Sequence, residues 1–91
     1  MTALVRFVVT ARSDPQTLPR LLNYVAQLGM TPRRVRADEA DGIMTVLIEQ
    51  EGLGDHQAGI IADKMAASVL TEDVRLTRGR RLMAPLCGLP V

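Results

Sequence analysis

One stretch of sequence decides the fold of this chain: residues 8–22, which read VVTARSDPQTLPRLL. Its β-branched start is typical of the end of a strand, Ser13-Asp14-Pro15 is a helix-start signal, and leucines at helical spacing follow. A strand that passes through a short polar turn into a helix leaves unpaired backbone N–H groups at the mouth of the turn. Such a mouth suits the carboxylate of a small ligand.

The size and composition of the chain indicate one small domain, which is marginally stable alone and gains from a partner. Hydrophobic residues make up 47% of the 91 residues, which excludes a disordered chain, and with one Phe, one Tyr and no Trp the core must be aliphatic. The net charge of +1 gives no general reason to expect nucleic acid. Cys87 is the only cysteine, which excludes an internal disulfide and a cysteine-based metal cluster and fits a cytoplasmic protein. The start lacks a signal-peptide pattern, and no apolar run approaches the roughly 20 residues that cross a bilayer.

The opening stretch belongs to a strand over residues 3–11 and to the helix that follows it. Both faces of the strand carry apolar residues, which predicts a central position in a sheet. The cap of this helix is either Asp14 or Thr17. With Asp14 as the cap, Pro19 would fall just past the first turn and remove a backbone hydrogen bond, so Thr17 is the alternative cap. Gly29 is placed as the helix C-cap.

The middle of the chain predicts a β-hairpin. Residues 32–39 are polar and begin with a proline, so we expect an edge strand in which Val35 and Ala37 face the core. Residues 40–42 contain Asp-Gly, a strong hairpin signal. Residues 43–50 are apolar on both faces, as a central strand is.

The last part of the chain predicts a helix and a short strand. The helix, residues 55–69, places four apolar side chains on one face: Ala58, Ile61, Met65 and Val69. Residues 71–73 are interpreted as a turn and residues 74–78 as the final strand. We take residues 1–79 as one domain and residues 80–91 as an irregular tail.

This order of elements predicts a ferredoxin-like βαββαβ sandwich, an α+β fold with a four-stranded antiparallel sheet and two helices on one face. Right-handed crossovers place the first and third strands in the centre. The other face of the sheet then needs cover, and we expect its apolar part to include Leu4, Val8, Met44, Val46 and Ile48. A bare apolar face of this kind favours self-association or a partner protein.

Residue types exclude several functions that this fold carries. An RNA-recognition module needs stacking aromatics on the first and third strands, where only Phe7 is present. The turn after the first strand has neither the Cys-x-x-Cys of a metal carrier nor the glycines of a phosphate cradle. His56 is the only histidine, and its spacing suggests no catalytic partner. With no catalytic or metal-binding constellation, the chain is expected to be a binding or regulatory module.

Two groups of arginines each have two interpretations. The arginines at positions 33, 34 and 36 either bind an anion or form a solvated strand edge that guards against aggregation. Those at positions 78, 80 and 81 either dock an acidic partner or belong to a solvated tail.

The order of elements and the opening stretch together resemble the ACT domain, and more narrowly the small regulatory subunit of acetolactate synthase, above all its isozyme II type. The resemblance covers residues 3–78. It is carried by the run Ala11-Arg12-x-x-Pro15-x-Thr17-Leu18-x-Arg20-x-Leu22, by Val25 and Gly29, and by the strand from Arg33 to Ala37.

The resemblance implies a non-catalytic subunit that needs no cofactor of its own. Such proteins pair as homodimers by joining edge strands into one eight-stranded sheet, and they bind a larger, thiamine-diphosphate-dependent catalytic chain of branched-chain amino-acid biosynthesis. They raise its activity, and many pass on inhibition by valine. In ACT domains the amino acid lies between the first strand–helix turn of one chain and the start of the second strand of its neighbour. The corresponding positions here are Ser13, Asp14, Gln16 and Thr17, with Thr31 across the interface.

The turn departs from the valine-binding relatives, which resemble Asn-x-x-Gly there and carry a second Asn after the helix-ending glycine. This chain has Ser13, Gln16 and Thr31 at these positions. A side chain at position 16 blocks close backbone approach, and Ser and Thr lack the amide group of Asn. These departures count against valine binding but leave support of a catalytic partner intact. Two alternatives stay open: a stand-alone ACT-type sensor of a small amino acid, and a structural dimerisation module for another enzyme.

Overall fold

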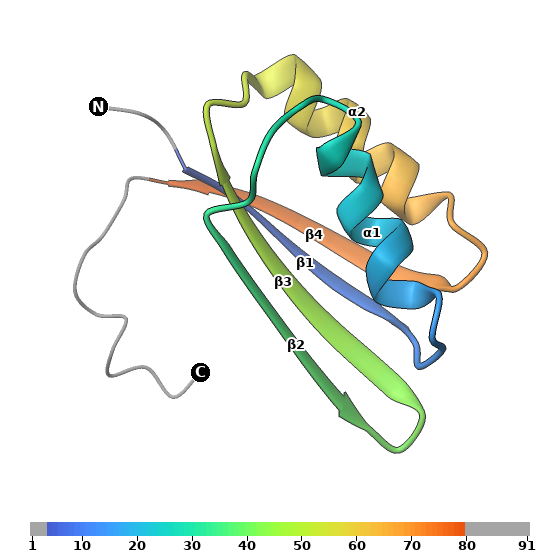
Figure 1. The fold of residues 1–91 in the computed structure, drawn as a ribbon. Helices are drawn as coiled ribbons and strands as arrows, with labels where there is room; N and C mark the ends of the chain where they lie inside the picture. Colours follow the sequence, from blue (N-terminus) through green and yellow to red (C-terminus); the bar gives the residue numbers. More distant parts are fainter. Residues whose placement is uncertain (1–3, 80–91) are drawn as a thin grey trace.

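The computed structural model describes residues 4–79, which form four strands and two helices. In chain order these are β1 (Leu4–Arg12), α1 (Thr17–Ala26), β2 (Arg34–Ala40), β3 (Ile43–Glu51), α2 (Asp55–Ala66) and β4 (Thr71–Gly79). The strands form one sheet in the order β2-β3-β1-β4, with every neighbouring pair antiparallel, and both helices lie on one side of it (Figure 1). The predicted βαββαβ sandwich is confirmed, with β1 and β3 central and β2 and β4 at the edges. The predicted tail, with Arg80, Arg81 and Cys87, lies outside the described residues.

The core lies between the sheet and the helices and is aliphatic except for Phe7. The register of β1 and β3 pairs Phe7 with Ile48 and Val9 with Val46. All four side chains are fully buried. The helices complete the core with Leu21, Val25, Ala58, Ile61 and Met65.

The predicted bare apolar face of the sheet is mostly wrong: of its five residues, only Leu4 and Val8 lie on the face away from the helices. Val46 and Ile48 lie under the helices, and Met44 packs against the same core. The face away from the helices instead pairs Arg6 with Glu49 and Val8 with Leu47. Thr45 and Glu49 lie on this outer side of β3, whereas Met44, Val46 and Ile48 lie on the other, so the more apolar set of side chains faces the helices. An apolar sheet face therefore gives no argument for a partner.

Helix α1 begins at Thr17, and Gln16 occupies its N-cap position without a capping side chain. Asp14 is not the cap: its carboxylate accepts the N–H of Gln16 at 2.8 Å within the preceding turn. Pro19 is therefore the third helical residue, where the missing N–H removes no helical hydrogen bond. At the other end the C-cap is Gln27, not Gly29, whose φ of +73° belongs to the turn beyond the helix.

The β2–β3 hairpin forms as predicted, with positive φ at Asp41 (52°) and Gly42 (80°). Val35 and Ala37 face the core side of the sheet as predicted, since they pair with Ile48 and Val46, but they are not buried: every residue of β2 is exposed, and Val35 retains 40% of its accessible surface. The outermost strand lies beyond the cover of the helices.

The C-terminal part also differs from the prediction. Helix α2 ends at Ala66, so Val69 lies beyond it and is 84% exposed. The turn is at residues 67–70, and residues 71–73 belong to β4. An irregularity opposite Thr10 and Ala11 accommodates this polar start of β4. On an edge strand, exposed acidic residues are compatible with strand structure.

Candidate functional site

The turn between β1 and α1 is held in place by two neighbouring loops. The backbone N–H of Arg12 donates to the carbonyl of Leu70 at 2.9 Å, and that of Ser13 donates to the carbonyl of Gly42 at 2.8 Å. The first bond ties the turn to the α2–β4 connection and the second ties it to the β2–β3 hairpin. The turn is therefore a fixed structure whose polar groups have defined positions.

Two of the four predicted site residues in this turn have structural roles. Thr17 is only 2% exposed, and its hydroxyl donates to the carbonyl of Arg12 at 2.7 Å. The Asp14 carboxylate holds the N–H of Gln16, and the Asp14 carbonyl accepts the N–H of Thr17 at 3.0 Å. A carboxylate of the protein thus already occupies part of the expected anion mouth.

The other two residues of the turn present side chains that a ligand can reach. Within residues 4–79, the side chains of Ser13 and Gln16 make no hydrogen bond, and Gln16 is exposed. Thr71, which was not predicted as a site residue, pairs with Ala11 at the base of the turn. The Thr71 hydroxyl is buried without a hydrogen-bond partner among the described residues. Its position depends on the pairing of β4 with β1, so no local sequence pattern could have indicated it.

Thr31 does not lie with the other four predicted residues. It follows the C-terminal end of α1, and its carbonyl accepts the Gln50 side-chain amide at 3.1 Å. The ten residues of α1 separate it from the turn by about 15 Å along the helix axis. Only a second chain could bring a Thr31 to this turn.

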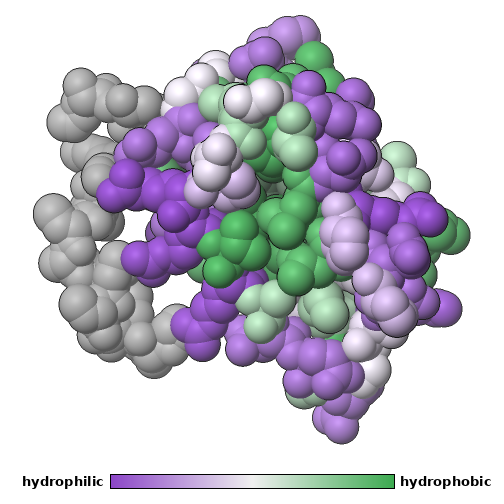
Figure 2. All heavy atoms as spheres, viewed as in Figure 1, coloured by the Kyte–Doolittle hydropathy of each residue, from purple (hydrophilic) through white to green (hydrophobic). Residues whose placement is uncertain are grey.

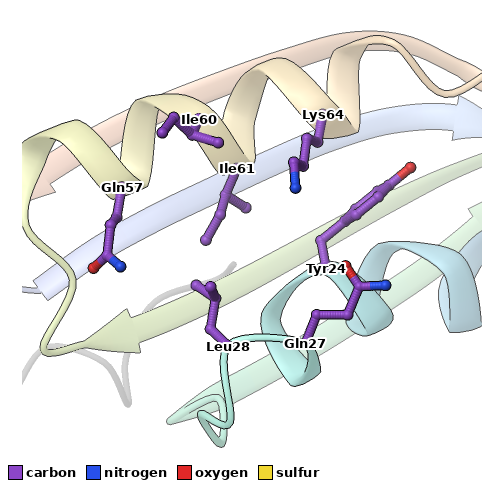
Figure 3. Close-up of a pocket in the computed structure, with 7 residues that line it drawn as sticks. All are labelled: Tyr24, Gln27, Leu28, Gln57, Ile60, Ile61 and Lys64. Carbon is purple, nitrogen blue, oxygen red and sulfur yellow. The ribbon is translucent and has the colours of Figure 1, made fainter.

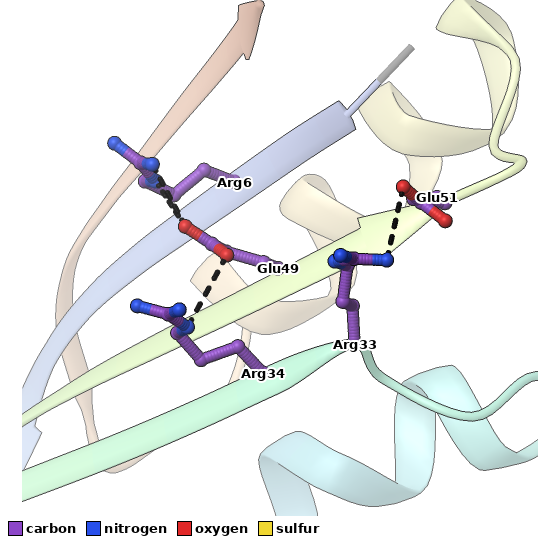
Figure 4. Close-up of polar contacts among 5 residues, drawn as sticks. All are labelled: Arg6, Arg33, Arg34, Glu49 and Glu51. Atoms are coloured by element: carbon purple, nitrogen blue, oxygen red, sulfur yellow. Dashed lines mark hydrogen bonds and ion pairs between the residues drawn. The ribbon is translucent and has the colours of Figure 1, made fainter. Parts of the chain in front are cut away.

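The arginines near Thr31 face carboxylates (Figure 4). Glu49, only 6% exposed, lies between Arg6 at 2.7 Å and Arg34 at 3.7 Å. Arg33 lies 3.3 Å from Glu51. These contacts favour a charge-balanced strand edge over an anion site.

The remaining polar candidates stay on the surface. Arg36 lies 3.1 Å from Asp38, and Arg78 lies 3.3 Å from Asp55 at the start of α2. His56 is exposed on the same helix. Over residues 4–79 no three His, Cys, Asp or Glu side chains gather in a way that could hold a metal ion. No helix in this part of the chain has the length and apolar character needed to span a membrane.

A groove between the two helices was not predicted. It has a volume of about 340 Å³ and lies between the end of α1 and the side of α2 that faces it (Figure 3). Its lining residues are Tyr24, Gln27, Leu28, Gln57, Ile60, Ile61 and Lys64. Apolar side chains gather on the helix-covered side of the molecule, bordered by polar ones (Figure 2). The groove results from helix packing, which periodicity within a single helix does not describe.

Comparison with protein families matches residues 1–82 to an ACT-like domain. The chain belongs to the ACT-like domain family. ACT domains are regulatory, non-catalytic modules that typically bind amino acids. The family match supports this general role and does not identify a particular enzyme or pathway.

Solved structures show the same fold in an ACT domain. The ACT domain of GTP pyrophosphokinase from Chlorobium tepidum has a TM-score of 0.73 at 12% identity, covering 85% of this chain and 100% of its own. The C-terminal domain of the MgtC protein from Mycobacterium tuberculosis has a TM-score of 0.71 at 14% identity, covering 91% and 94%. At these identities the similarity establishes the fold alone. Comparison with curated protein sequences finds no match.

Proposed function

We propose that this ACT-like protein is a regulatory small subunit that activates the thiamine-diphosphate-dependent catalytic chain of acetolactate synthase. The observation that carries the proposal is the run from Ala11 to Leu22, which resembles that subunit. In the fold this run forms a strand end, a turn tied to two loops, and a helix start anchored by the buried Thr17. ACT domains hold their effector at this same turn. The run that resembles the small subunit and the expected effector site therefore lie at one place.

We further propose that the working form is a homodimer joined through β2. β3 pairs with one edge of this strand, so its other edge offers backbone N–H and C=O groups to a second strand. Antiparallel pairing of two β2 strands would place the start of one beside the end of the other. The end of β2 leads to Gly42, whose carbonyl accepts the N–H of Ser13. The partner's Thr31 would thereby come toward the β1–α1 turn, completing the predicted effector site.

The sequence of β2 is self-complementary when two copies pair about Ala37. Arg36 then lies opposite the partner's Asp38 on the sheet face away from the helices, and Val35 lies opposite the partner's Glu39. Moving the centre of symmetry to Arg36 or Asp38 would place two like charges opposite each other, which destabilises a strand pair. Both helix pairs stay on one side of the sheet in the Ala37-centred register. Charge therefore favours this register.

Reconstitution tests the proposed function directly. The purified full chain is mixed with the acetolactate synthase catalytic chain of the same organism, and acetolactate formation is measured as the small subunit is titrated. We expect a saturable rise in activity. A flat titration would reject the acetolactate synthase assignment, while the ACT-like fold would stand. Calorimetry against the twenty amino acids would then separate the sensor from the dimerisation module: a saturable heat indicates the sensor.

A further inference from the structure

The α1–α2 groove has an apolar floor and a polar rim. Ile61, at 3% exposure, forms its floor, while Leu28 and Ile60 are each 41% exposed beside it. Tyr24, Gln27 and Gln57 contribute a hydroxyl and two amides. The volume of about 340 Å³ is at the lower end of the roughly 300–1,000 Å³ of ligand pockets, which suits a small molecule.

The groove carries one charged side chain, Lys64, and no carboxylate among its lining residues. Lys64 is the only lysine in the chain. It follows Ile60 by four residues and Ile61 by three, so its aliphatic stem shares their side of α2. Its side chain extends from α2 toward the gap between the helices (Figure 3).

The ammonium group of Lys64 makes no ion pair within residues 4–79. Of the eight arginines in the same part of the chain, seven lie within 4.0 Å of a carboxylate, and Arg20 is the exception; the seven are Arg6, Arg12, Arg33, Arg34, Arg36, Arg75 and Arg78. Nearby carbonyls at the end of α1 already accept the N–H groups of Gln27, Leu28 and Gly29. Lys64 is exposed, and no carboxylate of residues 4–79 neutralises its positive charge at the groove.

From this charge and lining we propose that the α1–α2 groove binds a small apolar monocarboxylate. The hydrocarbon part lies on Leu28, Ile60 and Ile61, and the carboxylate meets the Lys64 ammonium. Without a lining carboxylate, the groove offers only neutral acceptors, on Tyr24, Gln27 and Gln57, to the ammonium group of a free amino acid, while Lys64 repels it. This site is separate from the β1–α1 turn, because its α1 residues lie at the opposite end of that helix.

The single lysine gives a direct test on the full chain. Protein labelled with ¹³C-lysine shows one lysine ε-methylene NMR signal, which is followed during titration with sodium octanoate, octanamide and octylammonium chloride. We expect octanoate to shift this signal saturably, and octanamide to bind about 1.5- to 5-fold more weakly, because an ion pair to the exposed Lys64 is lost. Octylammonium should bind more weakly still.

Backbone amide shifts then compare variants under the same titration. Lys64→Met retains the aliphatic stem but removes the charge, so this variant should lose the preference for octanoate over octanamide. Ile60→Glu places a carboxylate at the rim and should abolish octanoate binding. Arg20→Met, which removes an exposed cation outside the groove, is the matched control and should leave the affinity unchanged. The proposal is overturned if octanoate gives no saturable shift, if Lys64→Met retains the preference, or if the shifted amides surround the β1–α1 turn instead. None of these outcomes depends on acetolactate synthase.

Discussion

Reversing the charge of Arg36 should weaken the proposed homodimer. In the Ala37-centred register, Arg36→Asp changes two symmetric Arg–Asp pairs into two Asp–Asp pairs. Opposite charges across a strand pair contribute about 0.2–1 kcal/mol and like charges cost a similar amount. Two pairs together then lose about 0.8–4 kcal/mol, which corresponds to a rise of about 4- to 900-fold in the dimer dissociation constant. Sedimentation equilibrium over a range of protein concentrations measures this constant.

The chain contains a matched control on the opposite edge of the sheet. Arg75 lies 3.3 Å from Asp73 on β4, much as Arg36 lies 3.1 Å from Asp38 on β2. Arg75→Asp makes the same change in net charge and should leave the dissociation constant unchanged, whereas Arg36→Asp combined with Asp38→Arg should restore it. An equal effect of both single variants, or a double variant as weak as Arg36→Asp, would refute the β2 interface in this register.

Three further predictions concern stability and ligand binding. Thr17→Val should lower the free energy of unfolding by about 1–3 kcal/mol, since the Arg12 carbonyl loses its buried donor; an unchanged urea midpoint would show that this bond contributes nothing. In the same assay, Met65→Ala should lower the free energy of unfolding by about 2–5 kcal/mol, because Met65 is fully buried. Val69→Ala should lower it by less than about 0.5 kcal/mol, because Val69 is 84% exposed. Equal losses for the two variants would contradict the observed end of α2. Valine should give no saturable heat in calorimetry with the wild-type protein, because the Gln16 side chain blocks backbone approach; measurable binding would show that the departures in the turn are tolerated.

Several features of the fold were predictable because neighbouring residues encode them. Asp41-Gly42 supplies the two positive φ angles of the hairpin, and the polar strand before it could only be an edge. The leucines after the turn have helical spacing, and the scarcity of aromatic residues required an aliphatic core. The order of these elements, with right-handed crossovers, then left the ferredoxin-like sandwich as the consistent arrangement.

Parts of the candidate site could also be located in advance, though not its geometry. The strand–turn–helix pattern placed Ser13, Asp14, Gln16 and Thr17 together at one turn. Which of their polar groups are already engaged depended on contacts with Arg12 and with backbone groups of the turn. The separation of Thr31 from this turn follows from the length of α1, and its proposed return follows only from a second chain.

The sequence by itself therefore determined which elements form and in what order, through periodicity and turn chemistry that act within a few residues. Tertiary structure alone decided how far the helices cover the sheet, where β4 begins, and that Lys64 lies in a groove beside α1. These features depend on strand register and on packing between elements that are distant in the chain. On β2, alternation directs Val35 and Ala37 to the helix side of the sheet, and only the placement of the helices, which do not cover this outermost strand, leaves both residues exposed.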